Sequence, residues 1–217
     1  MCFSASASFS AGAVTAAIGV ATLSHVKGWR ELPLASIPLL FAAQQVIEGE
    51  LWLHLAGEYD KQAIAMLSLS YVIFAKVLWP AFISLAVLLI EPDLLRRRAL
   101  YAIALLACSI SLYVLIRLIE NPPCATICGH SVRYGGDGDV LSWQGFIYIL
   151  CTCVPLLVSS SRAVQNFGAI VVSGFLVSAY TYAATFISVW CFFAATGSFI
   201  LYFYFKDAAA CTNLKRQ

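Results

Sequence analysis

The sequence of residues 62–90 is QAIAMLSLSYVIFAKVLWPAFISLAVLLI, and Lys76 is the one charged residue in it. At a rise of 1.5 Å per residue, a helix needs about 20 apolar residues to cross the roughly 30 Å hydrocarbon core of a bilayer. This stretch is long enough to span a membrane. It predicts an all-α membrane protein.

The rest of the chain has the same character, because 61% of its 217 residues are hydrophobic and only 11% are charged, against about 25% charged residues in a soluble domain. We predict one domain, residues 1–217, with a long outer loop at residues 120–142. Its seven transmembrane helices are expected at about residues 6–26, 33–55, 62–90, 98–119, 143–160, 164–182 and 185–205.

The distribution of Lys and Arg between loops predicts the orientation, because cationic loops stay in the cytoplasm. Lys61 and Arg133 fall on one side. The other side has nine cations: Lys27, Arg30, Arg96, Arg97, Arg98, Arg162, Lys206, Lys215 and Arg216. We therefore expect the N-terminus outside and the C-terminus in the cytoplasm, in a bacterial inner membrane. The net charge of +2 does not indicate nucleic-acid binding, and the oligomeric state stays open.

Ionisable residues inside a span are candidates for function, because an unpaired charge there costs several kcal/mol. Glu48 lies two turns below the outer end of the second helix, and Gln44, Gln45 and Trp52 share its face at 100° per residue. Glu50 is rotated by about 200° from Glu48, so the two acids do not form a pair. A buried structural ion pair would explain Glu48 equally well.

Lys76 lies near the middle of the third helix, where we expect it to find an acid or lose its proton. Pro80 follows four residues later and has no amide hydrogen, so the carbonyl of Lys76 should lose its helical partner. Arg117 lies near the outer end of the fourth helix, where it can pair with Glu120 three residues on or simply reach the outer surface.

These observations lead to one hypothesis about a binding site. We expect polar side chains of three helices to converge in a cavity open to the outside that binds a small polar or anionic ligand or an ion. The predicted ligand-binding residues are Glu48, Lys76, Arg117, Gln44, Gln45, Trp52, Tyr71 and Tyr113.

The outer loop contains Cys124, Cys128 and His130. Two thiols in an oxidising compartment favour a disulfide between Cys124 and Cys128. A metal site is the alternative and needs a fourth ligand, which Asp137, Asp139 or the tail could supply.

Two further features bear on a metal. Glu50 and His54 share one side of the second helix, although both can also simply reach the outer interface. Removal of Met1 would expose Cys2, whose amine and thiol could act as a nucleophile or a metal ligand. Whether the protein uses a metal as a cofactor stays open.

The opening Met1-Cys2-Phe3-Ser4-Ala5, followed by Ala7-Ser8-Phe9, Glu31-Leu32-Pro33, Gln44-Gln45, Glu48-Gly49 and Trp52, resembles an uncharacterised family of bacterial integral membrane proteins. The resemblance is clearest over the first two helices. It implies that the N-terminal tail and the face from Gln44 to Trp52 matter together, and it supplies no substrate and no reaction.

Three functions remain open from sequence. Ligand or ion binding and transport is the first. A membrane enzyme that uses a metal or the N-terminal cysteine is the second, and an assembly or partner protein is the third.

Overall fold

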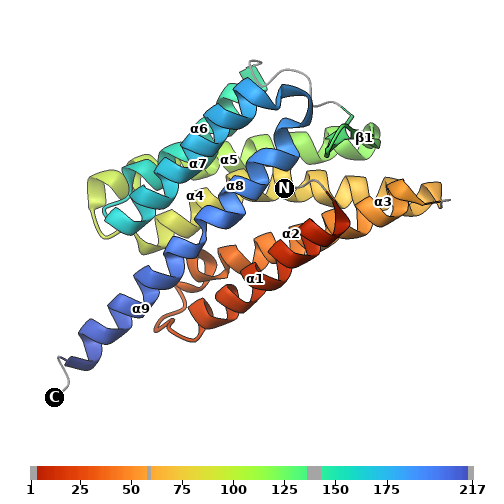
Figure 1. The fold of residues 1–217 in the computed structure, drawn as a ribbon. Coiled ribbons are helices and arrows are strands. Elements are labelled where there is room, and N and C mark those ends of the chain that lie inside the picture. Colours follow the sequence, from red (N-terminus) through yellow and green to blue (C-terminus); the bar gives the residue numbers. More distant parts are fainter. Residues whose placement is uncertain (1–3, 58–59, 136–142, 215–217) are drawn as a thin grey trace.

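The computed structural model describes residues 4–57, 60–135 and 143–214. Helices dominate it (Figure 1). In chain order the elements are α1 (Ala5–Leu23), α2 (Leu32–Ala56), α3 (Lys61–Val72), η1 (Ile73–Leu78), α4 (Trp79–Ile90), α5 (Leu94–Glu120), β1 (Ala125–Cys128), β2 (Ser131–Tyr134), α6 (Trp143–Val158), α7 (Arg162–Thr181), η2 (Ala183–Thr185), α8 (Phe186–Gly197) and α9 (Phe199–Leu214).

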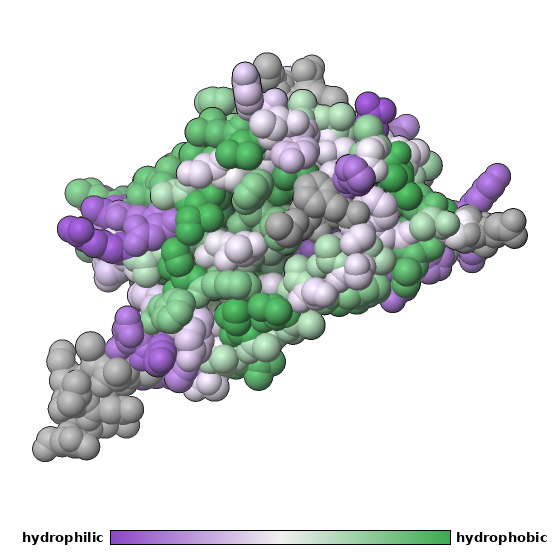
Figure 2. All heavy atoms as spheres, viewed as in Figure 1, coloured by the Kyte–Doolittle hydropathy of each residue, from purple (hydrophilic) through white to green (hydrophobic). Residues whose placement is uncertain are grey.

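The helices confirm an all-α, multi-pass membrane protein. Within the described ranges, six helical stretches are long and apolar enough to cross a bilayer: Ala5–Leu23, Leu32–Ala56, Lys61–Ile90, Leu94–Glu120, Arg162–Thr181 and Ala183–Asp207. A shorter apolar helix covers Gly145–Val158. Hydrophobic side chains cover most of the visible face, and hydrophilic ones gather mainly toward its ends (Figure 2).

The first two helices form a close antiparallel pair (Figure 1). A Cβ added to Gly19 would lie 2.6 Å from Leu39 Cγ, and one added to Gly49 would lie 2.8 Å from the Phe9 ring. At Gly12 an added Cβ would meet the α2 backbone at 3.4 Å. Small residues at Gly12, Gly19 and Gly49 therefore let the two helices approach closely.

The third span contains a π-helix, η1, which ends two residues before Pro80. The N–H of Trp79 donates to the carbonyl of Phe74, five residues earlier. In that register residue 80 would donate its N–H to the Ala75 carbonyl, but Pro80 has no N–H. The Ala75 carbonyl instead accepts from the Tyr148 hydroxyl at 2.6 Å. Sequence reasoning had assigned the released carbonyl to Lys76, because it assumed an ordinary α-helix.

Ser111 on α5 completes this arrangement. Its hydroxyl donates to the carbonyl of Val77 at 2.7 Å. Two neighbouring helices therefore each supply one hydroxyl to the backbone of the irregular segment, as the absence of water in a bilayer core requires.

Part of the predicted outer loop is an antiparallel hairpin, β1–β2, that closes one end of the bundle. Val132 and Tyr134 are buried, and the Tyr134 ring stacks on Tyr71 of α3 with 4.5 Å between ring centroids. These strands were not predicted, because residues 120–142 were expected to form a loop. The hairpin explains how residues of a loop come to lie in the core.

The predicted disulfide between Cys124 and Cys128 is wrong for this structure, in which both thiols are free. The four residues from Ala125 to Cys128 are extended, and four steps of about 3.3 Å separate the two Cα atoms by roughly 13 Å. A disulfide needs a Cα separation below about 7 Å.

At the opposite end, Glu91 ties the α4–α5 turn to the α6–α7 turn. Its carboxylate accepts hydrogen bonds from the Ser160 hydroxyl and from the Ser160 N–H, the latter at 2.8 Å. Burial alone would raise the pKa of Glu91, but the bonds from Ser160 and the Asp93 N–H, with the positive charge of Arg96, hold that pKa below its ordinary value.

Candidate ligand site within the bundle

The polar face predicted on the second helix is buried where α2, α4 and α8 meet. Gln44, Gln45 and Glu48 are fully buried, and Trp52 is nearly so. One turn of helix separates Gln44 from Glu48, and both point toward other helices rather than lipid. Sequence periodicity therefore identified these four residues as one face, and the fold encloses that face.

Two contacts from other helices hold the face in place. The indole N–H of Trp79 donates to Gln44 Oε1 at 2.8 Å. The hydroxyl of Ser188 donates to Glu48 Oε1 at 2.6 Å. Sequence reasoning missed Trp79 and Ser188, because a tryptophan and a serine in an apolar span carry no charge that singles them out.

Gln45 is the unusual member of this face. Neither its amide nitrogen nor its amide oxygen has a hydrogen-bond partner among the described residues, although both atoms are buried. The same holds for Gln44 Nε2 and Trp52 Nε1. A buried polar atom without a partner costs about 1–3 kcal/mol, so these four atoms together leave a large unmet demand for hydrogen bonds.

Helix α1 adds one more polar atom to this region. Gly12 packs against Gln45, and Phe9 packs against Gly49. In this antiparallel register Ser8, one turn before Gly12, lies near the level of Gly49. Ser8 is fully buried, and its hydroxyl has no hydrogen-bond partner among the described residues.

Lys76 and Tyr71 lie at a similar depth. The Trp79–Gln44 contact fixes the register of α4 against α2. From that contact, one turn along the third span leads to Lys76, and one turn along α2 in the same direction leads to Glu48. Tyr71 is fully buried and stacks on Tyr134 of the hairpin. The hairpin therefore covers the region on its outer side.

The structure does not bring Arg117 and Tyr113 to this face. Arg117 pairs with Glu120 at 3.0 Å, as the spacing of three residues predicted, and its side chain is 58% exposed. Tyr113 is 41% exposed, and its ring lies 6.4 Å from that of Trp143. Both residues lie on the outer surface of α5.

The residues considered for a metal are also dispersed. The Nδ1 atom of His54 lies 2.9 Å from the backbone carbonyl of Glu50 rather than from its carboxylate. Cys124, Cys128 and His130 lie in or beside the hairpin, and the part of the chain that the structure describes has no group of three His, Cys, Asp or Glu residues able to hold a metal. Cys2, Asp137 and Asp139 lie outside the described residues.

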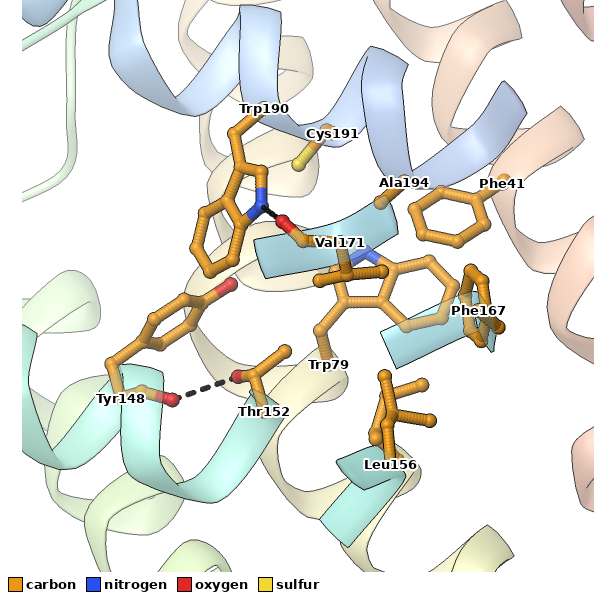
Figure 3. A pocket seen from close by; sticks show the side chains of 11 residues that line it. Phe41, Trp79, Tyr148, Thr152, Leu156, Phe167, Val171, Trp190, Cys191 and Ala194 are labelled. Carbon is orange, nitrogen blue, oxygen red and sulfur yellow. Dashed lines mark hydrogen bonds between the residues drawn. The ribbon is translucent and has the colours of Figure 1, made fainter. Parts of the chain in front are cut away.

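A small aromatic cavity lies beside Trp79, the residue that donates to Gln44 (Figure 3). Its volume is about 20 Å³, enough for about one water molecule. Trp79, Trp190 and Tyr148 line it, and the polar hydrogens of these three side chains donate to Gln44 Oε1, the Val171 carbonyl and the Ala75 carbonyl. This cavity is an apolar neighbour of the site rather than its polar centre.

Comparison with known proteins gives a family but no activity. A family model described as "Family of unknown function (DUF6629)" matches residues 1–216. No curated protein and no solved structure matches the chain. The match extends the resemblance noted over the first two helices to almost the whole chain.

Proposed function

The chain belongs to the DUF6629 family, and we propose that it binds a small polar ligand within the membrane, at the face formed by Gln44, Gln45, Glu48 and Trp52. Gln45 carries this proposal. A glutamine with both amide atoms buried and unpartnered destabilises the free protein. A ligand that supplies both partners removes that penalty.

The atoms of the face indicate the ligand's chemistry. Gln44 Nε2, Gln45 Nε2 and Trp52 Nε1 offer donors, and Gln45 Oε1 offers an acceptor. Glu48 adds a carboxylate at the same place, and Arg117 lies away on the surface. The three donors call for acceptor oxygens or nitrogens on the ligand, the Gln45 acceptor calls for an N–H or O–H group, and the Glu48 carboxylate disfavours an anion.

The proposal includes seven spans. Helix α6 has 16 residues, which rise about 24 Å, and it packs against α4, α5 and α7. Counting α6 as a span puts the nine cations of the loops and C-terminus on one side, against Lys61 and Arg133 on the other. The N-terminus is then outside and the C-terminus cytoplasmic, in a bacterial inner membrane.

Native mass spectrometry of the intact protein, released from a mild detergent, tests the proposal. We expect wild-type protein to retain a small-molecule adduct and Gln45→Leu and Glu48→Gln to lose it. Gln62→Leu is the matched control, because Gln62 is exposed at the start of α3. Its adduct should be unchanged.

Two results would overturn the proposal. One is an adduct retained equally by all four proteins. The other is wild-type protein without an adduct that co-purifies with another membrane protein even when Gln45 and Glu48 are substituted, which would support an assembly role.

A further inference from the structure

A groove of about 560 Å³ lies between the hairpin and the start of α8. This volume is within the range of small-molecule sites. The lining residues come from the hairpin and from the α7–α8 connection: Cys128, His130, Ser131, Thr181, Tyr182, Ala183, Ala184 and Thr185. The groove is separate from the α2 face.

Two nearly buried hydroxyl groups line the groove. Ser131 is 3% exposed and Thr185 is 5% exposed, and neither side chain makes a hydrogen bond within the described ranges. Thr185 is the N-cap residue of α8, yet its hydroxyl caps no N–H of that helix. Both hydroxyls are therefore available to a molecule in the groove.

The local electrostatics favour an anion. Helix α8 has 12 residues and begins beside Thr185, so the positive end of its dipole lies at the groove. His130 lines the groove. Arg133 follows Ser131 by two residues on β2, so the two side chains leave the same face of the strand. None of the eight lining residues is acidic.

We propose that this groove binds a small oxyanion, a carboxylate or a phosphate, through the hydroxyls of Ser131 and Thr185 and the first turn of α8. The site goes beyond the proposed α2 ligand site and does not rest on it. The start of α8 connects the two sites. Thr185 precedes Ser188 by three residues, about one helical turn, and Ser188 donates to Glu48.

The test uses the full-length protein in a neutral detergent. Thermal unfolding is followed while sodium phosphate or sodium acetate replaces sodium chloride at constant ionic strength and pH. A ligand of the folded state raises the melting temperature with its concentration. We expect that rise for at least one of the two oxyanions.

Substitutions then locate the effect. Thr185→Val and Ser131→Ala should each weaken the apparent affinity about tenfold, the effect of losing one hydrogen bond to a charged ligand, and Thr185→Ser should restore it. Thr181→Val is the matched control, because the Thr181 hydroxyl also borders the groove but already donates to the Val177 carbonyl at 2.6 Å. Its affinity should be unchanged.

A short-chain phosphatidic acid, titrated below its micellar concentration, identifies the source of the anion. A stronger response than to free phosphate assigns a lipid headgroup, and a weaker one assigns a soluble anion. The proposal fails if neither oxyanion exceeds chloride, or if Thr185→Val and Ser131→Ala respond as Thr181→Val does. The Ser131 variant keeps the test decisive if Thr185→Val does not fold.

Discussion

Some polar atoms in the core of this protein have hydrogen-bond partners from other helices, and others have none among the described residues. Beside Pro80, the carbonyls of Ala75 and Val77 receive hydroxyl donors from two other helices. On α2, at a similar depth, Gln45 keeps both amide atoms without a partner among the described residues. The chain thus supplies the hydrogen bonds that its own backbone requires and leaves others unmade. We interpret the unmade ones as reserved for a ligand.

The largest effect should come from removing a hydrogen-bond donor beside Pro80. Tyr148→Phe removes the donor to the Ala75 carbonyl, which then lies unpartnered in the bilayer. We expect the free energy of unfolding to fall by about 3 kcal/mol, measured by denaturant titration in detergent. Tyr180→Phe is the control, because Tyr180 is 92% exposed. Equal losses in both variants would mean that the hydroxyl at Ala75 contributes nothing special.

A gain in stability is expected from removing the buried amide atoms of Gln45. Gln45→Leu removes two buried polar atoms without partners, so ligand-free protein should gain about 2 kcal/mol of stability, seen as a higher melting temperature. A stabilising change that also abolishes ligand retention indicates a site kept at the expense of stability. A loss of stability would instead show that Gln45 is satisfied in the free protein.

Ser111→Ala tests the second hydroxyl beside Pro80 and should have a smaller effect. It removes the donor to the Val77 carbonyl, and we expect a loss of about 1 kcal/mol. Ser109→Ala offers a close control two residues away, since the exposed Ser109 hydroxyl donates only to Leu105 of its own helix. Indistinguishable unfolding curves for the two variants would mean that the Ser111 hydroxyl does not stabilise the π-helix.

A pH-dependent effect of similar size is expected outside the membrane core. The pKa of Glu91 is lowered in the folded protein, so Glu91 stabilises the fold above the ordinary carboxyl pKa of 4.5 and loses this contribution as pH falls through its lowered value. Glu91→Gln should therefore melt below wild type at pH 7, and the difference should shrink below about pH 4.5. A constant difference across that range would contradict the assignment.

The smallest effect is expected at Arg117. Its exposed pair with Glu120 should contribute less than about 0.5 kcal/mol, so Arg117→Gln should leave both the melting temperature and the adduct unchanged. Loss of the adduct would return Arg117 to the ligand site, as the sequence had suggested.

Much of this arrangement could be predicted from local patterns. Hydropathy indicated the apolar helices, and the 100° repeat grouped Gln44, Gln45, Glu48 and Trp52 on one face, because both signals lie within a single helix. The partners of that face could not be predicted. Ser188 lies 140 residues from Glu48, and only the packing of helices brings them together.

The errors have the same origin. Arg117 and Tyr113 were predicted to line the cavity, but the structure places both on the outer surface of α5. The disulfide between Cys124 and Cys128 was inferred from two thiols in an oxidising compartment, but the extended strand β1 separates the two thiols. Depth along a helix and spacing along a loop do not determine which direction a side chain faces.

The π-helix also has a consequence for biogenesis. Tyr148 lies 73 residues after Ala75 in the chain, and Ser111 lies 34 residues after Val77. During synthesis the third span therefore enters the membrane ahead of both donors. Until α5 and then α6 arrive, the carbonyls of Ala75 and Val77 must accept hydrogen bonds from water or from the N–H groups of an alternative helical register. The order of synthesis makes α6 the element that completes the middle of the third span.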